Sequence, residues 1–77
     1  MQVKIILHGV LREKLSPENK GIASLDVADS STISDLLSQL DIPQQVKCSI
    51  NEELERDFDR VLKNGDEIRC FRPIGGG

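Results

Sequence analysis

The chain has 77 residues, a formal net charge of −3 and two aromatic side chains, Phe58 and Phe71. This charge gives no electrostatic attraction to nucleic acid or to an anionic membrane, and two aromatic residues are too few for a base-stacking platform. With 38% hydrophobic and 30% charged residues, the composition is typical of one small globular domain. No apolar run approaches the ~20 residues of a membrane span. The first residues show a strand pattern and not a signal peptide, so we expect a cytoplasmic protein.

Alternating apolar residues predict two strands near the N-terminus. Their inward positions are Val3, Ile5 and Leu7 in the first strand, and Ala23, Leu25 and Val27 in the second. Ile6 is apolar on the outer face, which indicates a central strand or a contact surface. The residues between, 8–20, are mostly polar and carry turn chemistry. We therefore expect an antiparallel pair joined by a long loop.

A short amphipathic helix is the clearest local prediction. Thr32 and Asp35 have the spacing of a capping box, in which the two side chains satisfy each other's backbone amides. One apolar stripe follows at helical spacing, made of Ile33, Leu36, Leu37 and Leu40. Pro43 prevents the helix from continuing. The sequence predicts a helix over residues 33–41.

The second half of the chain contains two further strands and one ambiguous segment. Residues 46–50 alternate as a strand, and residues 67–71 form the last one, entered through the strong turn signal Asn64-Gly65-Asp66. Residues 53–62 fit either a helix or a short strand followed by a turn. Cys48 and Cys70 point inward in these strands, and we interpret them as reduced core thiols.

This order of elements predicts an α+β fold of the β-grasp, or ubiquitin-like, type. The sheet is mixed, with four to five strands and one main amphipathic helix across it, and the last strand runs parallel beside the first. We expect a single domain over residues 1–77, in which residues 73–77 are a flexible C-terminal functional tail.

The last residues of the chain are its most distinctive stretch, because Phe71-Arg72-Pro73-Ile74 leads into three glycines. Glycine lacks a Cβ, so such a tail can pass through a narrow channel. The hypothesis is that the carboxylate of Gly77 is the functional group. The alternative is a frayed or incidental end.

Three segments resemble the MoaD/ThiS sulfur-carrier family, closest to the small subunit of molybdopterin synthase. They are Leu11-Arg12-Glu13 after the first strand, Asn64-Gly65-Asp66-Glu67-Ile68 at the entry to the last strand, and the closing Phe-x-Pro-Ile-x-Gly-Gly. Gly75 stands where the family more often has Ala, Ser or Thr. The resemblance spans essentially the whole chain.

The resemblance implies that Gly77 is adenylated by an E1-like activating enzyme that uses ATP, and that sulfur from a donor protein then replaces AMP. The resulting thiocarboxylate would donate sulfur within the large subunit of molybdopterin synthase. Pro73, Ile74, Gly75 and Gly76 would form the tail that enters the partner. The chain would then be a carrier subunit and not itself a catalyst.

The residues agree with a carrier, because they contain no Ser/His/Asp set, no phosphate loop and no zinc-site spacing. We expect no bound metal or cofactor. Partner binding is expected on the outer sheet face, where Ile6 and Phe71 would form an exposed apolar patch beside Lys4, Arg69 and Arg72. The acidic residues between Glu52 and Asp59 would be a solvated face or meet a basic partner.

Three other functions stay open at this point. The first is a carrier for thiamine synthesis or another sulfur-transfer pathway. The second is a ubiquitin-like modifier joined to target lysines through Gly77. The third is a non-covalent interaction module with an incidental tail.

Overall fold

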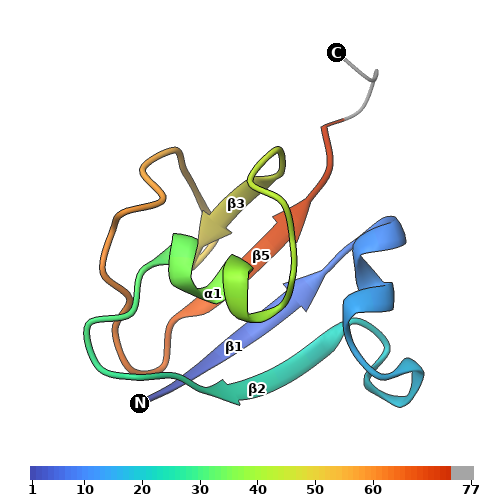
Figure 1. Ribbon diagram of the computed structural model, residues 1–77, viewed down its shortest axis with the longest axis horizontal. Coiled ribbons are helices and arrows are strands. Elements are labelled where there is room, and N and C mark those ends of the chain that lie inside the picture. The colour runs from blue at the N-terminus through green and yellow to red at the C-terminus, as the bar shows by residue number, and fades with distance from the viewer. Residues whose placement is uncertain (74–77) are drawn as a thin grey trace.

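A five-stranded mixed sheet in the order β2-β1-β5-β3-β4 is the scaffold of the protein (Figure 1). The strands are β1 (Gln2–Leu7), β2 (Ile22–Asp26), β3 (Lys47–Ile50), β4 (Glu53–Glu55) and β5 (Glu67–Phe71). One α-helix, α1 (Ile33–Gln39), lies across one face of the sheet, and two 3₁₀ turns, η1 (Gly9–Lys14) and η2 (Pro17–Asn19), connect β1 to β2. This computed structural model describes residues 1–73, so the rest of the predicted tail lies outside the described residues.

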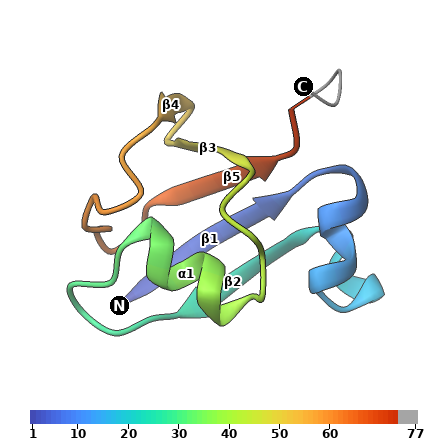
Figure 2. The ribbon, with the colours of Figure 1, turned by 45° about the horizontal axis from the view of Figure 1, so that its top comes forward.

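The pairing of the strands confirms the predicted β-grasp fold. The first and last strands, β1 and β5, run parallel in the middle of the sheet, with Ile5 opposite Ile68 and Leu7 opposite Cys70. The other three pairings, β1 with β2, β3 with β4 and β3 with β5, are antiparallel. The crossover between the two halves of the chain contains α1, which covers the sheet face in both ribbon views (Figure 2).

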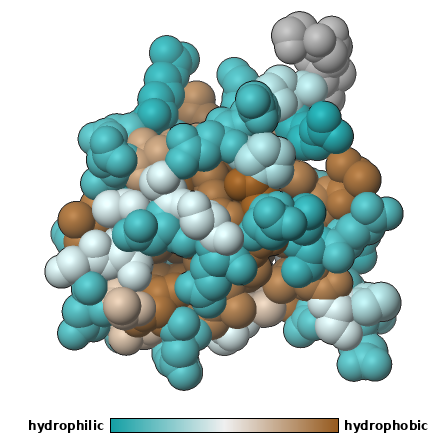
Figure 3. Space-filling model, in the orientation of Figure 1, coloured by the Kyte–Doolittle hydropathy of each residue, from teal (hydrophilic) through white to brown (hydrophobic). Residues whose placement is uncertain are grey.

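The hydrophobic core lies between α1 and the sheet. Its most completely buried side chains come from the helix stripe and from alternate strand positions: Ile5, Ile33, Leu36, Leu37, Ile50, Ile68, Cys48 and Cys70. From the side of α1, hydrophilic side chains cover most of the surface and hydrophobic residues show between them (Figure 3). The period-2 and helical patterns of the sequence therefore identify the buried faces correctly.

The helix begins as predicted but ends two residues earlier. Thr32 Oγ1 accepts a hydrogen bond from the Asp35 amide (3.1 Å), and Asp35 Oδ2 accepts one from the Thr32 amide (3.0 Å), which completes the capping box. At the other end Asp41 adopts φ +57°, and the Ile42 amide donates to the Leu37 carbonyl (2.8 Å). This Schellman motif stops the helix at Gln39, before Pro43 is reached.

The ambiguous segment 53–62 contains a strand and no helix. Asn51 and Glu52 both have positive φ, +51° and +74°, as a tight hairpin turn between β3 and β4 requires. After β4, Arg60 donates a hydrogen bond to Glu55 (2.8 Å), which lowers the pKa of that carboxyl. The ion pair supports the loop that returns the chain to β5.

The turn at residues 64–66 fixes the start of β5 against its neighbours. Asn64 Oδ1 accepts a hydrogen bond from the Gln2 amide (2.8 Å), and the Gly65 amide donates to the Gln2 carbonyl (2.7 Å). The buried Asp66 carboxylate accepts from the Lys63 amide (2.8 Å) and from the Asn51 side chain (3.1 Å). The predicted turn therefore joins the beginnings of β1 and β5 and the end of β3.

Replacement of Asp66 tests this joint. We expect Asp66→Ala to lower the free energy of unfolding by about 1–3 kcal/mol, because it leaves the part-buried Lys63 amide and the Asn51 side chain without their acceptor. The measurement is urea unfolding, with Asp59→Ala as the control, since Asp59 is exposed. The control is expected to change stability by less than about 0.5 kcal/mol. Equal losses in the two variants would contradict the assigned role of Asp66.

The two cysteines face each other inside the core as free thiols. They are direct partners in the β3–β5 register, both are fully buried, and their Sγ atoms lie 3.4 Å apart. The contact with Cys48 and burial raise the pKa of the Cys70 thiol. The interpretation of both residues as small core side chains is confirmed.

Burial predicts that these thiols react only when the protein unfolds. Iodoacetamide added to the native chain should leave both cysteines unmodified, since a buried, protonated thiol is a poor nucleophile. In denaturant both should be alkylated within minutes, as judged by intact mass. Ser24→Cys places a thiol at an exposed position of β2 and provides the reactive control. Alkylation of the native wild-type chain at the rate of this control would refute the assignment.

Candidate functional site at the base of the C-terminal tail

The base of the tail is the end of β5, a strand held on both sides. Within β5, Ile68 and Cys70 face α1, whereas Glu67, Arg69 and Phe71 face the opposite side of the sheet, called the outer face below. After Phe71 the chain leaves the sheet as Arg72 and Pro73 and points away from its body (Figure 1). Because β5 lies between β1 and β3, the point where the tail leaves is rigidly placed.

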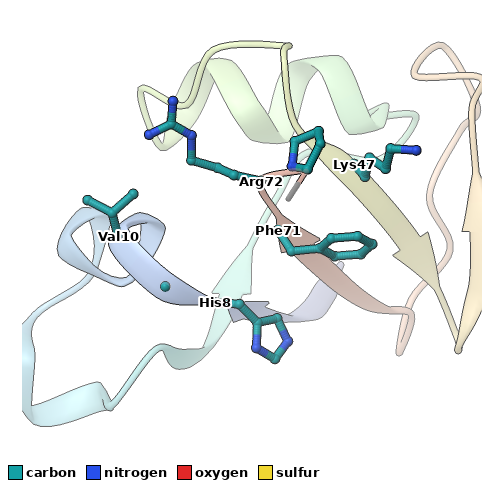
Figure 4. A pocket seen from close by; sticks show the side chains of 7 residues that line it. His8, Val10, Lys47, Phe71 and Arg72 are labelled. Carbon is teal, nitrogen blue, oxygen red and sulfur yellow. The ribbon is translucent and has the colours of Figure 1, made fainter. Parts of the chain in front are cut away.

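Phe71 lines a shallow hollow of about 550 Å³ at the end of β5. We call it the Phe71 hollow. It is lined by His8, Gly9, Val10, Lys47, Phe71, Arg72 and Pro73. The half-buried Phe71 ring lies between the side chains of His8 and Lys47 (Figure 4). Parallel pairing brings His8 here, since its amide donates to the Cys70 carbonyl (3.1 Å). The result is an apolar centre with a basic rim beside the tail.

The outer face brings together only part of the patch predicted from the sequence. Arg69 and Phe71 share this face, and Ile6 pairs directly with Arg69. However, Ile6 is only 8% exposed, so its expected exposure is wrong. It lies in a central strand, with Ile22 of β2 as its partner on the other side, and these neighbours shield it.

The basic residues of the predicted patch have different surroundings. Lys4 and Arg69 share one carboxylate, since Glu67 Oε1 lies 3.8 Å from Lys4 Nζ and 4.0 Å from Arg69 Nη2. Arg72 points away from Phe71 (Figure 4) and also lines a second hollow with Pro43 and Val46. Arg72 makes no ion pair with another residue of 1–73.

Four residues that line the Phe71 hollow were not predicted from the sequence: His8, Gly9, Val10 and Lys47. Val10 is 52% exposed and, like Arg72, lines both the Phe71 hollow and the hollow beside Pro43. Its signal was present, since it is an apolar residue in an otherwise polar segment. Lys47 enters the site because it pairs with Phe71 across β3 and β5. That register could not be read from an alternating pattern.

Residues 1–73 contain no cluster of three potential metal ligands, and none of their buried side-chain polar atoms lacks a hydrogen-bond partner. None of their helices has the length and apolar character to cross a bilayer. The predicted residues Ile74, Gly75, Gly76 and Gly77 lie outside the described residues, so the site consists here of the base of the tail and its surroundings.

The family model that matches this sequence is that of the ThiS family, over residues 5–77. The chain belongs to the ThiS family. Its members are ubiquitin-like sulfur carriers, so the resemblance seen in the three sequence segments is confirmed at the level of the family. The sequence has no significant match among curated proteins.

Solved structures of the same fold include two of one archaeal protein. SAMP1 from Haloferax volcanii superposes with a TM-score of 0.73 at 18% identity, covering 100% of both chains. Another structure of H. volcanii small archaeal modifier protein 1 gives a TM-score of 0.75 at 18% identity, over 95% of this chain and 98% of that one. A complex of subunits 1 and 2 of the molybdopterin-converting factor from Helicobacter pylori 26695 contains a chain that superposes with a TM-score of 0.68 at 19% identity. The match covers 100% of this chain and 100% of that chain. At these identities the likeness shows the fold.

Proposed function

We propose that this member of the ThiS family carries sulfur for the synthesis of molybdopterin, the organic part of the molybdenum or tungsten cofactor. The observation that carries the proposal is the exit of a proline- and glycine-containing end from a central strand beside the Phe71 hollow. The structural likeness to a complex of molybdopterin-converting factor subunits supports this branch of the family.

The proposed chemistry takes place on the Gly77 carboxylate. A carboxylate is a poor electrophile until one oxygen becomes part of a leaving group. The E1-like partner would therefore join Gly77 to AMP from ATP, with release of pyrophosphate. Sulfide-level sulfur from a donor protein would then displace AMP and leave a thiocarboxylate. In this proposal the chain supplies the reacting end, and its partners supply the catalytic groups.

Delivery requires the end of the chain to reach a partner's pocket. Five residues, 73–77, span at most about 17 Å at ~3.3–3.6 Å each. Ordering them on binding costs about 1–2 kcal/mol per residue in backbone entropy. This loss of backbone entropy offsets much of the binding energy that contacts to the tail provide. We therefore expect the folded surface of the domain to contribute to the affinity.

The Phe71 hollow is the surface best placed to provide that affinity. Phe71 and the exposed Val10 supply an apolar centre, and His8, Lys47 and Arg72 supply the basic rim. Interfaces of this kind concentrate their binding energy in a central aromatic residue surrounded by polar groups. The hollow also adjoins the tail, so one partner could hold both at once.

A second candidate function is a ubiquitin-like modifier whose Gly77 is joined to lysines of other proteins. The structural likeness to the small archaeal modifier protein favours it specifically. Both functions begin with an activated C-terminal glycine, and they differ in the group that receives the activated end.

Intact mass of the chain isolated from its native cells tests the tail chemistry. The carrier is expected to show a fraction heavier by one oxygen-to-sulfur exchange at the C-terminus, and deletion of Gly76-Gly77 should abolish it. The modifier would instead show a series of higher-mass conjugates that disappears with the same deletion. An unmodified mass with no effect of the deletion would refute both functions.

Phe71→Ala tests the docking surface. We expect binding to the molybdopterin synthase large subunit to weaken by about tenfold or more, because the central aromatic contact is lost. The fold should persist, since Phe71 is the last residue of β5 and is only half-buried. Val61→Ala is the control: Val61 is 51% exposed and does not line the Phe71 hollow. Isothermal titration calorimetry with an unchanged affinity for Phe71→Ala would rule out the assigned role.

A further inference from the structure

Another hollow, separate from the one that Arg72 lines with Pro43 and Val46, adjoins the Phe71 hollow on the outer face. It has a volume of about 350 Å³, and His8, Arg12, Lys20 and Arg69 surround its floor of Ile6 and Ile22. We call it the basic hollow. His8 and Gly9 line both hollows, so the two form one continuous surface. Ile22 is 46% exposed, which leaves apolar area open among the cations.

The charge of the basic hollow is opposite to that of the whole chain. The sequence has 13 acidic and 10 basic residues, yet no carboxylate of residues 1–73 lines this hollow. Arg69 shares Glu67 with Lys4. Arg12 and Lys20 are exposed and form no ion pair with another residue of 1–73. Residues 1–73 therefore neutralise the positive potential of this hollow only in part.

Local packing holds Arg12 in place over the junction of β1 and β2. A Cβ on Gly21 would lie 2.9 Å from Arg12 Cγ and 2.6 Å from the Leu7 carbonyl oxygen, and Gly21 has φ +80°. Glycine at this position therefore allows the stem of Arg12 to lie against the backbone. A cation supported in this way loses less side-chain entropy when it binds an anion.

We propose that the basic hollow docks an acidic segment of the protein that receives the C-terminal tail. Carboxylates of that segment pair with Arg12 and Lys20, and an apolar side chain between them packs on Ile6 and Ile22. Rim charges of this kind steer association and fix the orientation of the complex. The identity of the partner as a tail-receiving protein rests on the proposed function, whereas its acidic and apolar chemistry rests on the hollow.

Charge and size favour a protein segment over a polyanion. A nucleic acid or a lipid surface presents many phosphates to the whole molecule, whose net charge is −3. A short acidic segment meets only the local cations and also has apolar side chains to fill the floor. Lys20 and the two arginines of the basic hollow therefore fit an acidic peptide best.

The experiment is a titration of the isotope-labelled full chain, followed by NMR, with a synthetic peptide of alternating Glu and Leu residues. The expected shift changes centre on Arg12, Lys20, Ile22 and Arg69 and shrink as salt is added. Lys20→Glu should weaken binding by about fivefold or more, because it turns an attraction into a repulsion. Lys63→Glu is the matched control, since Lys63 is exposed and does not line the hollow. Equal losses in the two variants, or shift changes centred elsewhere, would overturn the proposal.

Three further measurements complete the test. A thermal midpoint of Lys20→Glu equal to that of the wild type shows that the fold is kept. If the midpoint of this variant falls, Arg12→Gln is used in place of Lys20→Glu, and the same loss of affinity is expected. Tighter binding of phosphatidylglycerol vesicles or of single-stranded RNA at these residues would overturn the peptide assignment. Deletion of Gly76-Gly77 should leave peptide binding unchanged, so failure of the tail chemistry is distinguished from failure of this docking surface.

Discussion

The parallel pairing of β1 with β5 is the constraint on which the rest of the structure depends. Parallel strands have their carboxyl ends at the same side of the sheet, so the residues that follow β1 lie beside the residues that end β5. Parallel pairs cannot close through a tight hairpin, and the turn around Asp66 supplies the fixed start that this pairing needs. The Phe71 hollow is a direct result, since one of its walls follows β1 and another belongs to β5.

The two faces of the sheet divide the work of the protein. The face under α1 buries the core, including both thiols, and sets the stability of the domain. The outer face carries the half-buried Phe71, the exposed Ile22 and a set of basic side chains. The central strand β5 ends on this same face with Phe71, beside the Phe71 hollow. The end of β5, with Arg72 and Pro73, therefore has a fixed position relative to the outer face.

The candidate site was only partly predictable from the sequence. Phe71 and Arg69 were found because alternation in the last strand assigns them to one face. Ile6 was assigned to the correct face but not to the correct exposure, since exposure depends on the side chains of β2 and β5 that flank it. Val10 and Lys47 join Phe71 through the parallel pairing and the β3–β5 register, which bring together residues distant in the chain.

The sequence by itself determined the elements with strong local chemistry and the family. These elements depend on residues only a few positions apart, so the sequence is enough to predict them. They are the capping box, the turn at residues 64–66 and the alternation of the strands. The tertiary structure decided the strand at 53–55 and the continuity of the two hollows beside the end of β5. Each of these depends on pairing register or on side chains packed from other elements, which an isolated segment does not encode.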